Sequence, residues 1–306
     1  MVVTDSGAEI YHGPPSALRF MPRAFLPRPS TDLARPFPDL RLASTGFDIH
    51  AAEHRALLGS CGIGGGSEDA VRVLLPHIFG FRLSMALLTH PRWPLPIWHA
   101  LQVRNRFLLH GPPATVMRGE LHASVAGWRV LAKGVEVDLH ARLVDSAACA
   151  WESIVTFYYR GRFAWQASPG EPVGAPRESP RMEMSGDPVA RWVTGTSDRW
   201  RFARWTGDYN GLHQWDWYAR LLGFPVAFSH PHRVAAQCLA RLACAFDGAQ
   251  QLDLWLKGPV PYGAAVRLDA RRDADAGGTD FTLTMEGASR PALAGMWRPL
   301  ATSQSA

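Results

Sequence analysis

The stretch "PHRVAAQCLARL", residues 231–242, repeats the pattern of "PHIFGFRLSMALL", residues 76–88. Each begins with Pro-His and continues with apolar residues at helical spacing, and proline is well suited to the first turn of a helix. The two stretches are 155 residues apart (231 minus 76), and a second pair of similar runs, beginning at residues 101 and 252, is 151 apart (252 minus 101). Two echoes in the same order at a nearly constant offset indicate a duplicated unit.

Each of these expected helices is followed by runs with the alternation and the β-branched or aromatic content of strands. In the first copy the runs cover residues 101–110, 114–128, 135–145 and 151–163, and in the second copy 252–263, 264–272, 280–288 and 292–300. The sequence therefore predicts an α+β fold in which one buried helix packs on an antiparallel sheet, twice.

Proline and glycine mark the limits of the two copies. Residues 1–43 are rich in proline and predict an extended arm, and residues 44–57 show a weak helical pattern before a glycine-rich loop. Residues 167–188 form a proline- and glycine-rich linker. We therefore expect an N-terminal half at 44–166 and a C-terminal half at 189–306.

Composition restricts the class of protein. Hydrophobic residues make up 47% of the 306 residues and charged residues 19%, which is ordinary for a soluble globular protein. We expect a cytoplasmic protein without a membrane segment, because no apolar run approaches the ~20 residues of a membrane span and the N-terminus lacks the order of a secretory signal. The net charge of +5 comes from dispersed basic residues, so a small anionic ligand is expected and nucleic acid is not.

Four cysteines are scattered along the chain without Cys-x-x-Cys spacing. They are Cys61, Cys149, Cys238 and Cys244. This spacing predicts reduced, mostly buried thiols, with neither a zinc site nor a disulfide framework.

The run "GDYNGLH", residues 207–213, is the most informative for chemistry. Gly207 and Asn210 are turn formers, so Asp208 and His213 can be aimed at one point from a single bend. An acid and a base placed in this way can share a substrate. The alternative is a plain turn in which His213 only begins a short helix.

This run resembles the active-site pattern of the MaoC-like acyl dehydratases, or (R)-specific enoyl-CoA hydratases, which is Gly-Asp-x-Asn-Pro-hydrophobic-His. Six of the seven places fit, and Gly211 replaces the proline. The element order over residues 45–300 also resembles the family's double hotdog, in which a long helix is wrapped by an antiparallel sheet, twice. The first half lacks the motif, because "FDIHAAEH" has neither the spacing nor the glycine turn.

The resemblance implies a hydro-lyase that adds water to a trans-2-enoyl-CoA or dehydrates an (R)-3-hydroxyacyl-CoA. Asp208 would activate water, His213 would complete the acid–base pair, and Asn210 and Gly207 would orient them. The basicity of Asp208 is expected to be raised beside the imidazole in a dry cleft. No metal or redox cofactor is implied, the partner is an acyl-CoA or acyl carrier protein thioester, and the first half would accommodate the acyl chain. The resemblance leaves a homodimer open.

The start of the second helix is the expected substrate contact. Ser229, His230, His232 and Arg233 surround a helix N-terminus, where free N–H groups favour developing negative charge. The family usually has His-Gly here, but this chain has His230-Pro231, and proline has no N–H. Either His232 or Arg233 supplies the oxyanion donor, or the site is weakened.

Two alternatives therefore stay open besides the hydro-lyase. One is another thioester reaction on the same fold, such as hydrolysis by an acyl-CoA thioesterase. The other is an acyl-CoA-binding protein with a silenced site. An intact pair of Asp208 and His213 favours an enzyme, whereas Pro231 favours the binder.

Overall fold

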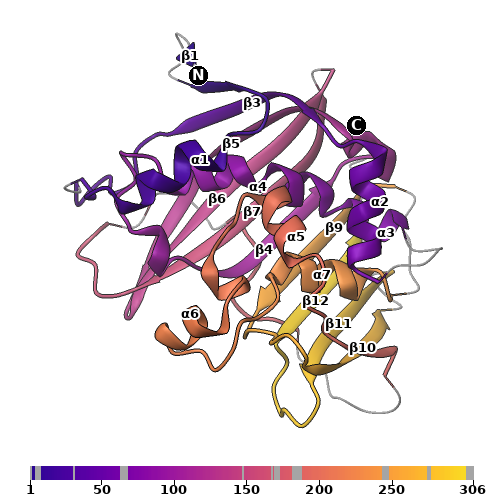
Figure 1. Ribbon diagram of the computed structural model, residues 1–306. Helices are drawn as coiled ribbons and strands as arrows, with labels where there is room; N and C mark the ends of the chain where they lie inside the picture. Colours follow the sequence, from indigo (N-terminus) through magenta and orange to yellow (C-terminus); the bar gives the residue numbers. More distant parts are fainter. Residues whose placement is uncertain are drawn as a thin grey trace.

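The structure, a computed structural model, is built on one continuous sheet of twelve strands. Helices α4 (Leu75–Leu88), α5 (Arg199–Thr206) and α7 (Pro231–Leu239) lie on one of its faces (Figure 1). The structure describes residues 2–3, 8–29, 32–62, 68–146, 148–166, 168, 173–180, 188–242, 248–273 and 277–300.

Ten of the twelve strands form two sets of five with the same internal order, and β2 (Glu9–His12) and β1 (Val2–Val3) extend the sheet beyond the first set. The first set is β3 (Arg41–Asp48), β5 (Arg118–Leu131), β6 (Gly134–Asp145), β7 (Ala148–Arg160) and β4 (Leu101–Leu109). The second set continues from it as β9 (Gln250–Leu256), β12 (Leu293–Pro299), β11 (Gly278–Met285), β10 (Ala265–Asp273) and β8 (Ala190–Val193). Read outward from the β4–β9 junction, the two sets match strand for strand, as a duplicated unit requires.

Each set has one central helix, α4 (Leu75–Leu88) in the first half and α7 (Pro231–Leu239) in the second. These are the two predicted helices. The remaining α-helices are α1 (Ala17–Phe20), α2 (Ala51–Ser60), α3 (Glu68–Arg72), α5 (Arg199–Thr206) and α6 (Asp216–Leu221). Short 3₁₀ turns are η1 (Met21–Phe25), η2 (Ile97–His99), η3 (Pro113–Val116) and η4 (Gly211–His213). The predicted α+β double hotdog is confirmed.

Helix α4 is the core of the first half. Every residue of it except Arg82 is buried, which explains its apolar character all round. The segment Asp69–Leu88 is long and apolar enough to cross a membrane, contrary to the expectation from the sequence, but 89% of its most apolar window is buried inside the protein. It is therefore accounted for as a core helix.

The two halves meet where β4 pairs antiparallel with β9. Phe107 lies opposite Leu252 on the core side, and both are fully buried. On the other side of the sheet Arg106 pairs with Asp253, with 2.8 Å between Nε and Oδ1. Apolar packing on one face and an ion pair on the other join the halves into one body.

Three expectations from the sequence need comment. Residues 44–48 are not helical: they belong to β3, because β2 (Glu9–His12) and β5 pair with this segment, and helix α2 begins only at Ala51. Residues 1–43 are more than an extended arm, since they contain β2, α1 and η1. Most of the linker at 167–188 lies outside the described residues. So does Cys244, whereas Cys61, Cys149 and Cys238 are free thiols.

Candidate active site

The predicted bend begins where helix α5 ends. Gly207 has a left-handed φ of 71°, and a Cβ there would lie 2.6 Å from Arg82 Cγ, so only glycine fits. The chain then turns twice through side-chain bonds: Asp208 Oδ1 accepts the Asn210 N–H (3.0 Å), and Asn210 Oδ1 accepts the Leu212 N–H (3.1 Å). The second bond caps η4, the turn that carries His213.

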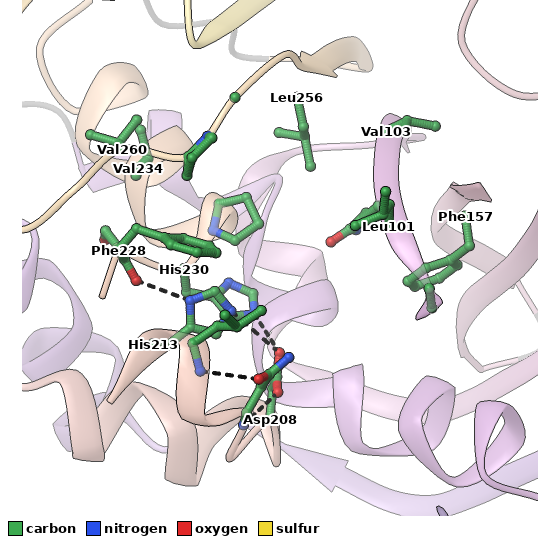
Figure 2. A pocket seen from close by; sticks show the side chains of 18 of the residues that line it. Leu101, Val103, Phe157, Asp208, His213, Phe228, His230, Val234, Leu256 and Val260 are labelled. Atoms are coloured by element: carbon green, nitrogen blue, oxygen red, sulfur yellow. Dashed lines mark hydrogen bonds and ion pairs between the residues drawn. The ribbon is translucent and has the colours of Figure 1, made fainter. Parts of the chain in front are cut away.

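Three side chains converge at this bend. His213 Nε2 lies 3.8 Å from Asp208 Oδ2, and His230 Nε2, from the residue before α7, lies 3.4 Å from the same oxygen (Figure 2). The side chains of all three are 15% exposed or less. The structure thus brings the predicted acid and base together and adds His230 to them.

The outer hydrogen bonds of the two histidines fix where their protons lie. His213 Nδ1 is 3.0 Å from the Phe228 carbonyl oxygen, so Nδ1 carries the proton and Nε2 presents a lone pair. His230 Nδ1 accepts the His232 N–H, so its Nε2 carries the proton and faces the carboxylate. Asp208 and His213 are therefore both acceptors, and His230 is the donor that holds Asp208.

The charges of the pair follow from this arrangement. Burial opposes ionisation of Asp208, but the hydrogen bond from His230 and the neighbouring imidazoles outweigh it and lower its pKa to about 2. Burial lowers the pKa of His213 to about 4, although Asp208 opposes that shift. The expected rise in the basicity of Asp208 is wrong, because the effect of its partners is larger than that of the dry cleft. At neutral pH the site holds a carboxylate and a neutral imidazole.

A cavity of about 440 Å³ opens beside the pair. Asp208, His213 and His230 lie on one side of it, and Leu101, Val103 and Phe157 of the first half lie across from them (Figure 2). The second half adds further apolar walls. These are Phe228, Val234, Leu256 and Val260. The catalytic candidates thus face an apolar chamber built by both halves.

The four predicted substrate contacts divide into two groups. Ser229 and His230 line the cavity, whereas His232 and Arg233 do not. His232 Nε2 accepts from Gln102 and Asn105, and the Arg233 guanidinium donates to the Ser60 carbonyl at 3.0 Å.

The expectation that His232 or Arg233 supplies the oxyanion donor is also wrong. The backbone N–H of His232 is taken by the His230 ring, and that of Arg233 by the His230 carbonyl. Among the described residues that line the cavity at the bend, the Ser229 hydroxyl and the Asn210 side-chain NH₂ have no protein partner.

Two further positioning contacts escape sequence reasoning. Tyr262 donates its hydroxyl to the His213 carbonyl (3.2 Å), and the His230 ring is held at the N-terminus of α7. The sequence contains a signal for the second, since His230 occupies the N-cap position before a helix-starting proline.

The same three side chains also have the geometry of a metal site. One ligand atom from each of Asp208, His213 and His230 lies within 4.8 Å of the others. Two imidazoles and a carboxylate suit a divalent transition metal. Acid–base and metal-assisted chemistry are therefore both compatible with the donor set.

No protein-family profile matches this chain, and no curated protein sequence matches it. Solved structures do. HtdX of Mycobacterium tuberculosis has a TM-score of 0.67 at 22% identity, covering 85% of this chain and 100% of that one. A MaoC-like dehydratase from Phytophthora capsici has a TM-score of 0.67 at 14% identity, covering 89% and 98%.

A third similar structure is the full-length peroxisomal multifunctional enzyme type 2 from Drosophila melanogaster. Its TM-score is 0.62 at 16% identity, covering 85% of this chain and 48% of that one, so this chain spans about half of the larger enzyme. At these identities the likeness establishes a shared fold.

Proposed function

We propose that this chain, which has the double-hotdog fold of the MaoC-like dehydratases, is a hydro-lyase acting on acyl thioesters. It would add water to a trans-2-enoyl thioester, or remove water from the (R)-3-hydroxyacyl thioester. The observation that carries the proposal is the convergence of two unprotonated acceptors, the Asp208 carboxylate and His213 Nε2, beside an apolar cavity.

A water molecule between these two acceptors would donate one hydrogen bond to each, with its oxygen facing the β-carbon of the substrate. As the oxygen bonds to that carbon, the pair takes one proton from the water. The electrons of the double bond move to the thioester oxygen. Both groups are unprotonated before the reaction, so the pair can hold the proton that it takes from the water. It then donates this proton to the α-carbon, which completes the addition.

Two donors that line the cavity would stabilise the charge on the thioester oxygen. They are the unpartnered Ser229 hydroxyl and the Asn210 side-chain NH₂. His230 would keep the carboxylate of Asp208 in position through its Nε2 proton. The apolar walls suit a hydrocarbon acyl chain, and the exposed Lys257, which also lines the cavity, suits an anionic phosphate of coenzyme A.

A panel of trans-2-enoyl-CoAs of increasing length tests the proposal. Loss of the conjugated enoyl absorbance without release of thiol is the expected result, and it persists after treatment with a chelator. Release of free thiol would indicate a thioesterase, and loss of activity with the chelator would indicate metal-assisted chemistry. Tight binding of acyl-CoA with neither reaction would indicate a binding protein.

Pro231→Gly tests the oxyanion contact. A lost donor at such a site costs about 2.7–4 kcal/mol. If Ser229 and Asn210 supply the contact, restoring an N–H at position 231 changes the rate little, and Ser229→Ala lowers it. A feeble wild-type rate that Pro231→Gly raises would mean that the contact is missing.

A further inference from the structure

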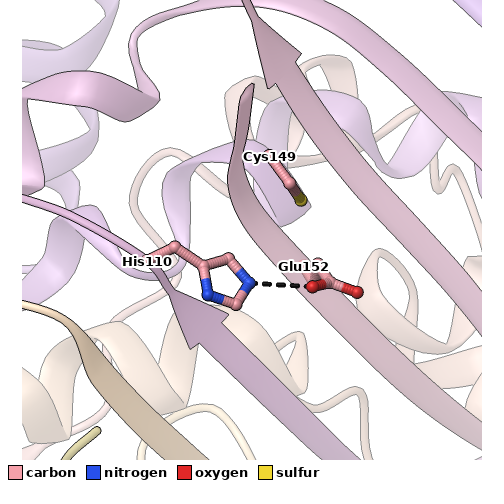
Figure 3. Close-up of side chains that lie close together, drawn as sticks. All are labelled: His110, Cys149 and Glu152. Atoms are coloured by element: carbon pink, nitrogen blue, oxygen red, sulfur yellow. Dashed lines mark hydrogen bonds and ion pairs between the residues drawn. The ribbon is translucent and has the colours of Figure 1, made fainter. Parts of the chain in front are cut away.

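A second cluster of metal-ligating side chains lies outside the cavity, on β4 and β7 of the first half. His110 follows the end of β4, and Cys149 and Glu152 lie near the start of β7 (Figure 3). One ligand atom from each lies within 4.8 Å of the other two. We propose that these three residues bind a Zn²⁺ ion, with the fourth position open to water.

An irregularity in β7 builds this cluster. In a regular strand, residues three apart point to opposite faces. Leu143 pairs with Trp151 but the next residue, Val144, pairs with Cys149, so Ala150 is an extra residue in β7. This bulge shifts the alternation by one and turns Cys149 to the same face as Glu152, opposite the buried Trp151.

The bulge also positions the third ligand. The Ala150 carbonyl accepts the backbone N–H of His110 at 3.0 Å, which fixes the end of β4 beside β7. All three ligands thus stand on a hydrogen-bonded sheet, where little ordering is needed for an ion to bind.

The donor set favours zinc. It offers one imidazole nitrogen, one thiolate and one carboxylate, a mixture that matches Zn²⁺ and does not match ions that prefer oxygen alone. Thiolate and carboxylate together balance the two charges of the ion. Three protein ligands leave one of the four tetrahedral positions for water.

A fourth residue supports the carboxylate from behind. Glu152 Oε1 lies 2.8 Å from His110 Nε2, and its other oxygen, Oε2, lies 2.7 Å from His140 Nε2. An ion would replace the proton between His110 and Glu152, while His140 continues to hold Oε2. His140 is therefore a positioning residue outside the ligand set, of the kind that orients ligands in metal sites.

Titration of the full chain with Co²⁺, followed by displacement with Zn²⁺, tests the proposal. A thiolate-to-cobalt charge-transfer band that saturates at one ion per chain is expected, and Zn²⁺ should abolish it. The band reports a cysteine ligand, so an ion at Asp208, His213 and His230 would not produce it.

Substitutions locate the site. Cys149→Ser should remove the band, and His110→Ala and Glu152→Gln should each weaken Zn²⁺ binding by at least tenfold. His140→Ala should weaken it about 10–100-fold, whereas Cys61→Ser, in a cysteine buried elsewhere, should change nothing. Circular dichroism checks that each variant is folded. The absence of a thiolate band, or a band that survives Cys149→Ser, would overturn the proposal.

Discussion

The two halves share their strand order and the Pro-His start of their central helices, but they differ at the residue before that proline. In the second half it is His230, which faces Asp208. In the first half it is Leu75, which is fully buried in the apolar core. One position therefore supplies a polar partner in one copy and packing in the other.

The segments that precede the two central helices also differ in how far their acidic and histidine side chains are exposed. The side chains of Asp208 and His213 beside the cavity are 15% and 10% exposed, whereas those of Asp48 and His50 in the first half, which lie 3.6 Å apart, are 55% and 73% exposed. The acid–base candidates therefore come from the second half, whereas the first half contributes apolar walls to the cavity.

The largest expected effect is loss of the pair. Asp208→Asn or His213→Ala should each lower hydration by roughly 10²-fold or more, the scale of general acid–base catalysis. Both residues lie on a bend outside the central helices, so the fold should survive, which circular dichroism can verify. A folded variant with near-normal turnover on the best substrate would refute the assignment.

The next effect comes from making the second half resemble the first. His230→Leu installs the residue type found at position 75 and removes the donor that lowers the pKa of Asp208. A hydrogen bond to a charged group contributes about 1.5–3 kcal/mol, so turnover should fall about 10–100-fold. The acid limb of the pH–rate profile should also move to higher pH.

His230→Gln is the matched control for that variant, because its amide can still donate to Asp208. It should recover part of the rate and keep the acid limb lower than in His230→Leu. Equal loss in both variants, with unchanged pH profiles, would reduce His230 to a packing residue.

The histidines at the start of the two central helices are alike in both halves and predict a stability effect. His77 and His232 meet with ring centroids 4.0 Å apart, and burial lowers the pKa of both, that of His77 to about 3. Below pH 6.5 these two histidines become protonated in the unfolded chain but stay neutral in the folded chain. As the pH is lowered below 6.5, the free energy of unfolding should therefore decrease by up to about 1.4 kcal/mol per pH unit for each such histidine.

Urea unfolding at several pH values between 7 and 4 measures this slope. His77→Phe should flatten it by one histidine relative to the wild type, whatever its effect at pH 7. A slope that is the same in both proteins would mean that His77 is protonated in the folded chain.

Much of this comparison could be predicted from the sequence, and the remainder depends on geometry that spacing does not encode. The echo of residues 76–88 at 231–242 and the bend at 207–213 are local patterns, and both were predicted correctly as structure. Residues 44–48 were assigned wrongly because strand pairing with β2 and β5 outweighs a weak helical period. The role of His230 depends on which of its ring nitrogens accepts the hydrogen bond from the backbone N–H of His232 at the start of α7.

The cluster on β4 and β7 shows the same limit more sharply. Cys149 and Glu152 are three apart, a spacing that predicts opposite faces in a strand, and His110 follows a different strand, β4. Only the bulge at Ala150 brings the side chains together. Cysteine spacing alone therefore predicted no metal site.

A smaller effect is expected from the shape of the first half. Val103→Phe adds bulk to the wall across from the pair, so it should disfavour long enoyl chains more than short ones. Each methylene excluded from the apolar cavity is worth about 0.8 kcal/mol, so two excluded methylenes should shift the preference about tenfold. The ratio of kcat/KM for long and short substrates measures this, and equal loss for both would place the acyl chain elsewhere.

The smallest effect should come from the first half's own acid and base. Asp48→Ala and His50→Ala should each leave turnover within about twofold of the wild type, because neither residue lines the cavity and an exposed pair of this kind contributes only about 0–1 kcal/mol to stability. The measurement is kcat and KM on the substrate used for Asp208→Asn. A folded variant at either position that loses more than tenfold would show that the first half takes part in the chemistry, and the division between the halves would have to be abandoned.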